Sequence, residues 1–447
     1  MISDEAAEHY RGLHSQIEAR RLAPAVSRDK WADSLPALYT TVNANCWDTG
    51  KHVCERPGHC CVRRICSWIR FPRRAVLRRH GRAWRIAFIA LGAGHAARSL
   101  AHSVRDLRER AAKLRHAEGS ASTCRRCQAP KTPATGAVLD ASSMYEKVDA
   151  AQVILAAQFV VKVLSSKGYC GVLVHRERRL RGELWRYPGS YRSGAYLATW
   201  GDMLTALRYG LSGRYARFGD VVFEQVGGLP IGGPLGDLGA GLLLTLHEAT
   251  WRQTPALRAL HGYAGWQTAE DYDEAVAATR YVDDVVALSL QLCARCLAEL
   301  VQKQHPGVPF VVEHTSEAGP LPWLDVVVYA ERLPPHIAPA LPERRWVLEG
   351  GAMPQTYRVP PYLGERHMDE SALRSHVRSC LARFHQTQHA HREMSRAVLY
   401  EMLLLRRAGH PWSRSLRVWR SHSRDHRLAA LVRRVCADVQ ARLTERQ

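Results

Sequence analysis

Hydrophobic and polar positions follow different patterns in three parts of the chain. Up to about residue 135, apolar residues show little periodicity except over residues 96–116, where Leu100, Val104, Leu107 and Ala111 recur every three to four residues with arginines between them. This spacing is typical of an amphipathic helix. The pattern therefore predicts an N-terminal extension, residues 1–135, that contains one clear helix.

Residues 136–335 combine short β-rich runs with helical patterns. We expect strands at residues 136–140, 220–226 and 324–329, hairpins at 169–186 and 278–290, and helices at 144–165, 199–209 and 233–250. Residues 336–447 become basic and helical, with helices expected over 372–386, 390–408 and 428–443. This order predicts an α+β region followed by a separate α-helical unit.

The net charge of the chain indicates which kind of partner it binds. The 447 residues contain 63 Lys and Arg against 42 Asp and Glu, a formal charge of +21, which favours a polyanion such as nucleic acid. The longest uncharged apolar stretch near the N-terminus, residues 86–94, is too short to cross a membrane. The start, Met1-Ile2-Ser3-Asp4-Glu5, has no signal pattern, so we expect an intracellular protein, nuclear or cytoplasmic, with no membrane partner.

Two aspartate sites fall at the ends of predicted strands. Asp140 ends the first strand of the α+β region, and Asp283 with Asp284 follows Tyr281-Val282 at the tip of the second hairpin. Phosphoryl transfer to a hydroxyl uses two divalent cations about 4 Å apart, held by carboxylates. Taken singly, the pair also fits an ordinary turn, and Asp140 also fits a helix N-cap.

A glycine-rich loop lies between these sites. Residues 228–235 read Gly-Leu-Pro-Ile-Gly-Gly-Pro-Leu and directly precede an apolar helix. Glycines let a backbone approach a bound base pair closely. An ordinary strand-to-helix connection also favours Gly and Pro, but its position between the two aspartate sites favours a functional loop.

Together these features resemble the reverse transcriptase family. The family carries an Asp followed five positions later by an aromatic residue, here Tyr145, then a Gly-x-Pro-x-Gly loop, then Tyr-x-Asp-Asp, and all three occur here in that order. Residues 321–328 are also similar to a segment that follows the hairpin in Penelope-like and other non-LTR retroelements. Within that segment, we expect Asp325 to be structural.

The resemblance implies an RNA-directed DNA polymerase of a retroelement. It implies a polymerase palm over residues 136–335, with an antiparallel sheet and helices on one face, and an α-helical thumb over residues 336–447. The expected partners are an RNA template, a DNA primer and deoxynucleotide triphosphates.

The resemblance also implies a set of site residues. Two Mg²⁺ ions would be held by Asp140, Asp283 and Asp284. Tyr145 would lie under the nucleotide sugar and reject a 2′ hydroxyl, and Tyr281 would face the primer terminus. The loop would lie against the template and the incoming base, which makes Pro230, Gly232 and Gly233 substrate-binding residues.

The chain departs from the family in two places. Ile231 and Gly233 stand where the family usually has Gln and Ser. No fingers segment with triphosphate-binding Lys and Arg is identified before Asp140, so residues 1–135 are either divergent fingers or the chain is a truncated copy. The alternative function is therefore a catalytically degenerate retroelement remnant that binds nucleic acid without synthesis.

Cysteines offer a second kind of chemistry. Cys124 and Cys127 form a C-x-x-C knuckle, whereas Cys293 and Cys296 lie in an apolar helical pattern that favours core packing. An N-terminal cluster could hold a structural Zn²⁺, although its spacings favour free thiols. The cluster consists of Cys46, Cys54, Cys60, Cys61 and Cys66 with His52 and His59. A zinc-dependent nucleic-acid adaptor is thus a third hypothesis.

Two segments mix arginines with aromatic residues. Residues 63–85 carry Trp68, Phe71 and Trp84, and residues 406–434 carry Trp412 and Trp419. Such a mixture is suited to phosphates and stacked bases, while a solvated helical face is the alternative.

Overall fold

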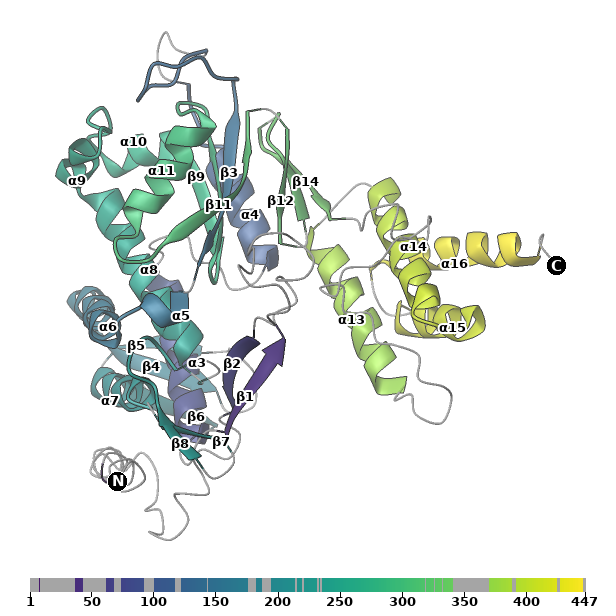
Figure 1. Cartoon of the computed structure of the whole chain (residues 1–447), viewed down its shortest axis with the longest axis horizontal. Coiled ribbons are helices and arrows are strands. Elements are labelled where there is room, and N and C mark those ends of the chain that lie inside the picture. The colour runs from purple at the N-terminus through teal and green to yellow at the C-terminus, as the bar shows by residue number, and fades with distance from the viewer. Residues whose placement is uncertain are drawn as a thin grey trace.

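The structure, a computed structural model, has three neighbouring parts (Figure 1). Two mixed helix-and-sheet parts adjoin each other, and four C-terminal helices form the third. The structure describes residues 8, 37–42, 62–67, 74–91, 100–116, 122–142, 144–175, 182–186, 194–213, 215–218, 221–230, 233, 235–317, 319–324, 326–331, 333–340, 370–387, 391–423 and 427–444. No helix within these residues is both long and apolar enough to cross a bilayer.

A four-stranded antiparallel sheet forms the centre of the first part. Its order is β11 (Phe310–Ser316), β3 (Thr135–Ala141), β10 (Asp284–Ser289) and β9 (Val276–Tyr281). Nearly every residue of β3 is buried, because both alternating sets of its side chains are apolar or small. The sheet is therefore covered on both faces.

Different helices cover the two faces of this sheet. Val138 and Val286 pack in one apolar cluster with α4 (Leu100–Ala111) and a small sheet of β12 (Pro320–Trp323), β13 (Val326–Tyr329) and β14 (His336–Pro339). Leu139 and Val285 pack in another cluster with α8 (Gly236–Gln253), α10 (Ala269–Ala275) and α11 (Ala294–Gln304). The expectation of helices on one face is wrong, since α4 from the N-terminal region packs on the second. Helix α9 (Pro255–Leu260) follows α8.

The second part shares the larger of these two clusters. It holds the sheet β5 (Gly182–Arg186), β4 (Tyr169–His175) and β6 (Ala195–Thr199). Helices α3 (Arg74–Leu91), α6 (Ala150–Ser166) and α7 (Trp200–Leu211) contribute to the same cluster. A further sheet has the order β2 (Val62–Ser67), β1 (Ala37–Val42), β7 (Tyr215–Phe218) and β8 (Val221–Glu224). Strands and a helix from before residue 135 are thus built into the α+β part.

The C-terminal helices have an apolar core of their own. They are α13 (Glu370–Thr387), α14 (His391–Arg407), α15 (Trp412–Ser423) and α16 (Ala429–Thr444). Their buried cluster, which includes Leu373, Val398 and Trp419, draws only on residues of these helices and of the turn at Leu428. The three predicted helices are confirmed, and α15 is an addition to them.

Two predicted elements are interrupted. The expected helix 144–165 is two helices, α5 (Met144–Lys147) and α6, because Asp149 adopts an extended conformation and caps α6 by accepting from the Ala151 N–H at 2.9 Å. The expected strand 324–329 begins two residues later, since Leu324, at φ 52°, lies in the turn between β12 and β13. Its backbone conformation there does not continue a strand.

Candidate active site at the β9–β10 hairpin

The sheet brings the two aspartate sites together. Asp140 of β3 and Asp284 of β10 are register partners in the antiparallel pair, so their Cα atoms lie about 4.5–5.5 Å apart and their side chains leave the same face. Asp283 lies in the adjoining turn, where its carbonyl accepts from the Ala141 N–H at 3.1 Å. All three aspartates are partly exposed. The three predicted aspartates are therefore neighbours at one end of the two central strands, β3 and β10.

The turn that carries Asp283 is strained. Tyr281 and Asp284 pair across it, which leaves Val282 and Asp283 as a two-residue loop, and Val282 has φ 60°. Such loops need positive φ, but a β-branched residue rarely adopts it, at a cost on the order of 1–3 kcal/mol. Something else in the structure must hold Val282 in place.

Buried Arg280 supplies that support. Its guanidinium donates to the Val282 carbonyl at 2.7 Å and to Glu248 Oε1 at 2.6 Å, and also to the Thr245 hydroxyl at 3.1 Å. Arg280 and Glu248 are 1% exposed each. The hairpin turn is thereby tied to α8, the helix that follows the glycine loop. The linear pattern gave no sign of this pair.

Tyr145 connects the glycine loop to the aspartates. Its carbonyl accepts from the Leu229 N–H at 2.6 Å. Burial, with the nearby carboxylates of Asp237 and Asp283 adding to it, raises the pKa of the Tyr145 phenol well above its usual value. The phenol therefore stays protonated, beside Asp283.

Gly228 is the loop position where a close approach is required. It has φ 77°, and a Cβ there would lie 2.3 Å from the Tyr145 carbonyl oxygen. The Gln225 side chain braces the same turn by donating to the Gly227 and Leu229 carbonyls at 2.8 and 2.9 Å. Sequence reasoning placed the critical glycines later in the loop, at Gly232 and Gly233.

The remaining predicted site residues lie around this centre. Tyr281 is partly buried against the α4 face of the sheet. Pro230 is buried, and its carbonyl accepts from the Gly233 N–H at 3.1 Å, which closes the loop on itself. Gly232 and Asp325 lie outside the described residues. Substrate contacts for all of these residues stay predictions.

The donor set suits a hard cation. Carboxylate oxygens are the ligands that Mg²⁺ prefers, and Asp140, Asp283 and Asp284 supply them from adjoining, rigid backbone. Their oxygens do not all lie within 4.8 Å of one another, unlike two other groups of potential ligands in the described part of the chain. Like-charged carboxylates repel each other, and bound cations would draw them closer.

The basic and aromatic segments divide into core and surface. Trp84 is fully buried and donates to the Met203 carbonyl at 2.9 Å, and Trp419 is fully buried among the C-terminal helices. Base stacking by Trp84 and Trp419 is therefore ruled out, because these rings fill the core, whereas Trp412 is partly exposed and its stacking stays a prediction. Trp68 and Phe71 lie outside the described residues.

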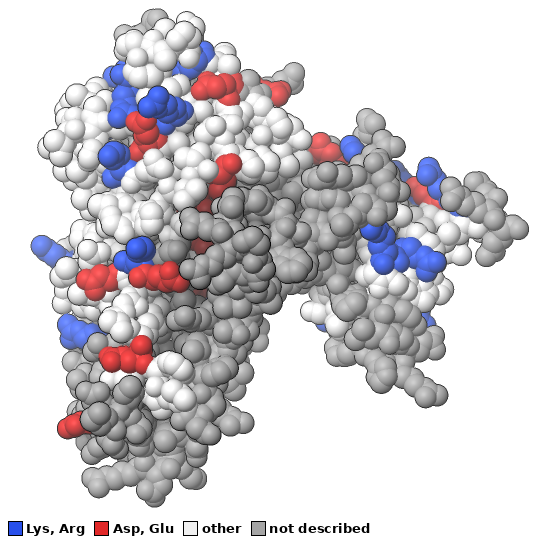
Figure 2. Space-filling model, viewed as in Figure 1, with Lys and Arg blue, Asp and Glu red and all other residues white. Residues whose placement is uncertain are grey.

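Arginines of the C-terminal unit remain on the surface. Figure 2 shows a group of Lys and Arg side chains on this unit, with few acidic ones on the same face. Exposed arginines of this unit include Arg406, Arg407, Arg417, Arg420, Arg433, Arg434 and Arg442. They form a positively charged surface, here called the C-terminal basic surface.

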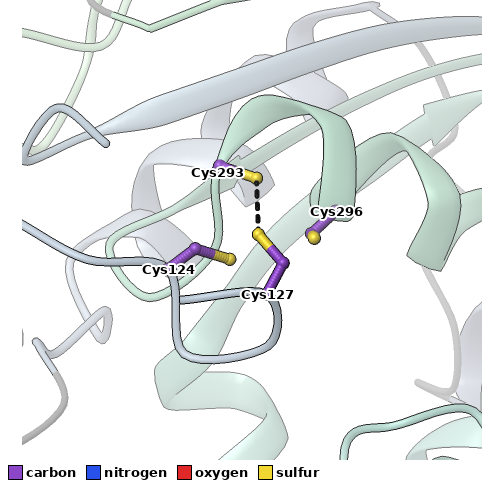
Figure 3. Close-up of side chains that lie close together, drawn as sticks. All are labelled: Cys124, Cys127, Cys293 and Cys296. Atoms are coloured by element: carbon purple, nitrogen blue, oxygen red, sulfur yellow. Dashed lines mark hydrogen bonds between the residues drawn. The ribbon is translucent and has the colours of Figure 1, made fainter. Parts of the chain in front are cut away.

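The cysteines group differently from the sequence expectation. Cys124 and Cys127 lie beside Cys293 and Cys296 (Figure 3). Burial of the second pair is confirmed, but core packing alone does not describe it. The N-terminal cluster falls outside the described residues, apart from the backbone of Cys66 in β2.

Comparisons with known proteins find partial similarity in structure alone. No protein-family model matches the chain, and no curated protein matches it significantly in sequence. Telomerase from Candida albicans in complex with the TWJ fragment of telomeric RNA aligns over 92% of this chain and 65% of its own, at 9% identity and a TM-score of 0.47. Two structures of Candida tropicalis telomerase, apo and with the TWJ fragment, align over 76% and 82% of this chain and 53% of their own. Both have 9% identity, with TM-scores of 0.39 and 0.36.

This chain thus spans less than two thirds of the telomerase chains that it resembles.

Proposed function

We propose that the chain is a nucleotidyltransferase, an RNA-directed DNA polymerase of a retroelement. The main observation in support of this proposal is the pairing of Asp140 with Asp284 across β3 and β10, with Asp283 in the adjoining turn. Three carboxylates from two distant points of the sequence are neighbours there, near Tyr145 and the glycine loop. The order of these motifs along the chain supports the reverse transcriptase class over other metal-dependent phosphoryl transferases.

The three aspartates would hold two Mg²⁺ ions. When bound, the ions would stabilise charge on the attacking primer hydroxyl and on the leaving pyrophosphate oxygen. The chain's own residues contribute by positioning the aspartates and the glycine loop. Arg280 fixes the turn that carries Asp283, and the Tyr145 carbonyl fixes the loop at Leu229.

Tyr145 and Tyr281 would orient the two substrates. A neutral phenol at Tyr145, beside Asp283, would present a ring to the deoxyribose and leave no room for a 2′ hydroxyl. Tyr281, paired with Asp284 across the turn, would face the primer terminus. The loop at Pro230, Gly232 and Gly233 would lie against the template.

The β1–β2 hairpin is our proposed counterpart of the fingers. Its strands pair antiparallel along their whole length and join β7 and β8 in one sheet, and β8 leads into the glycine loop. The sequence of β2 includes Arg63 and Arg64. This pairing supports the reading of residues 37–67 as divergent fingers. The C-terminal helices would act as the thumb.

Primer extension tests the proposal directly. Full-length protein with Mg²⁺, an RNA template, a DNA primer and deoxynucleotides should extend the primer, and Asp283→Asn should abolish extension because the variant loses a metal-binding carboxylate. Asp149→Asn is the matched control: it makes the same chemical change nearby, and Asn still caps a helix. Extension that survives in Asp283→Asn would rule out this metal site.

The altered loop favours one alternative, a remnant that binds nucleic acid without synthesis. Ile231 and Gly233 depart from the family's loop. Binding of a primer–template duplex by wild-type protein, without extension under any of the tested divalent cations, would support the remnant and refute the polymerase.

A further inference from the structure

Four cysteine thiols meet at one point on the molecule (Figure 3). Cys124 and Cys127 come from the connection between α4 and β3, and Cys293 and Cys296 come from the start of α11. All four Sγ atoms lie within 4.8 Å of one another. We propose that these cysteines bind one structural zinc ion, at a site independent of the polymerase function.

The spacing of the sulfurs fits a single tetrahedral metal. Zinc–sulfur bonds of about 2.3 Å give a tetrahedron with sulfur–sulfur edges of about 3.8 Å, and the Sγ atoms of Cys127 and Cys293 are 3.8 Å apart. A disulfide between these two cysteines would need about 2.05 Å. A cluster of several irons would hold its cysteines around a larger core than this group encloses. A mononuclear site therefore fits best.

The backbone presents the first pair as a metal-binding knuckle. The Cys124 N–H donates to the Ala129 carbonyl at 2.8 Å, and the Gln128 N–H donates to the Cys124 carbonyl at 2.9 Å. Gln128 has φ 59°, which closes a tight turn around Cys127. Backbone amides of Arg126 and Cys127 hydrogen-bond to the Cys124 sulfur. Such bonds support a thiolate bound to metal.

The second pair lies at a helix start. Cys293 is the N-cap of α11, and its side chain makes no capping hydrogen bond. Cys296 follows in the first turn. Both cysteines therefore lie at the N-terminal end of α11, where the helix dipole favours a negatively charged group such as a metal-bound sulfur. A Ser or Asp would be the usual N-cap, and the cysteine is better explained by a ligand role.

Basic groups around the site offset the charge of four thiolates. Arg125 bonds to the Gln291 side chain at 2.9 Å, and Arg126 to Glu299 at 2.5 Å, which hold both arginines beside the knuckle. Lys131 lies close enough to interact electrostatically with Cys124 and Cys293. Four thiolates and one Zn²⁺ carry a net charge of about −2, which these cations would balance.

The site's place in the fold indicates its role. The knuckle leads into β3 and α11 follows β10, the two strands that carry Asp140 and Asp284. At their opposite ends Thr135 pairs with Ser289, and the Thr135 hydroxyl donates to the Leu292 carbonyl at 2.6 Å. Zinc would fix the two strands at the end away from the aspartates. With four protein ligands it leaves no open position for catalysis.

Metal analysis of the full-length protein is the first test. The double variant Cys293→Ser/Cys296→Ser should contain one zinc ion fewer per chain than wild type, while Cys170→Ser, which changes a cysteine outside the group, should lose none. The test compares the zinc content of the variant with that of wild type, because metal bound by cysteines before residue 67 would add equally to both. Equal zinc content in double variant and wild type, or iron in place of zinc, would overturn the proposal.

Alkylation of Cys127 tests the site without relying on a variant that could misfold. Cys127 is the exposed member of the four. In wild-type protein it should react with iodoacetamide more slowly, by on the order of tenfold or more, before zinc is chelated than afterwards, because a metal-bound sulfur is shielded. Cys170 in the same digest serves as the control. Equal rates for Cys127 before and after chelation would refute a bound metal.

Discussion

At the scale of single residues, the candidate site depends on residues that position the aspartates and are not themselves proposed to contact metal or substrate. Arg280 is buried with Glu248 as its partner, and its remaining donors serve Val282 and Thr245. Burying a charged pair is costly and is retained only where its geometry is satisfied. Here the Arg280–Glu248 pair holds a strained turn. Its role is therefore to fix the position of Asp283.

Arg280→Met should destabilise the fold by about 3–5 kcal/mol, because Glu248 would remain buried without its partner. The double variant Arg280→Met/Glu248→Leu should recover most of this loss. Urea unfolding of both variants measures the difference. Primer extension should remain impaired even in the double variant, since the bond to the Val282 carbonyl is still absent. Full activity in the double variant would show that Arg280 does not position the turn.

Gly228→Ala should lower primer extension strongly and destabilise the protein by roughly 1–3 kcal/mol, the usual cost of a strained backbone position. The added Cβ would meet the Tyr145 carbonyl and displace the loop from α5. Gly168→Ala is the control: it has φ 83° but open space around it. If both substitutions reduced activity equally, backbone conformation rather than the Tyr145 contact would be the cause.

At the scale of elements, the sequence predicted what local patterns encode. β3 and the β9–β10 hairpin were recognised from short apolar and β-rich runs next to aspartates, and most of their neighbours from periodicity. The break at Asp149 was missed because an apolar pattern runs through it. Contacts between distant segments left no local sign: Arg280 of β9 bonds to Glu248 of α8, and Cys124, which precedes β3, lies beside Cys293, which follows β10. Trp84 was predicted to lie on a binding surface, but it is in the core. A segment that mixes tryptophan with arginines has the same composition in either place, so composition cannot separate the two.

Helix α3 shows how far the N-terminal region is part of the fold. His80 is buried on it, bonded to the Val76 carbonyl at 2.9 Å. Burial lowers the His80 pKa below 6.5, with Arg79 acting in the same direction and Asp202 in the opposite one. The unfolded chain then binds the proton more readily than the folded one.

Unfolding free energy should therefore fall as the pH drops from 7 through 6.5 towards 5. His80→Gln removes this titration and should flatten part of the profile. Burial also lowers the pKa of His247, which accounts for a residual slope. Urea unfolding at several pH values checks the prediction. An unchanged slope in His80→Gln would show that folding does not lower the pKa of His80.

At the scale of the whole molecule, the C-terminal basic surface and the candidate site lie in different parts. The aspartates lie in the α+β part, and the C-terminal basic surface lies on helices with a core of their own. A contact between His336 of β14 and Glu393 of α14, at 3.1 Å, joins the two. This division fits the proposed polymerase, in which the helical unit would grip the duplex backbone and the sheet would carry the reaction.

The C-terminal basic surface should contribute a measurable share of binding to a primer–template duplex. Each phosphate contact that is lost lowers the slope of log K against log salt by roughly 0.7–0.9. Arg433→Gln/Arg434→Gln should therefore bind more weakly at low salt and with a shallower slope in a filter-binding series.

Arg105→Gln/Lys113→Gln, which removes two exposed charges at α4, is the matched control. Equal effects of the two double variants would point to the overall charge of +21 acting at a distance. A loss confined to Arg433 and Arg434 would instead locate the duplex on α16, because charges more than about 10 Å from the phosphates are largely screened in 0.1 M salt.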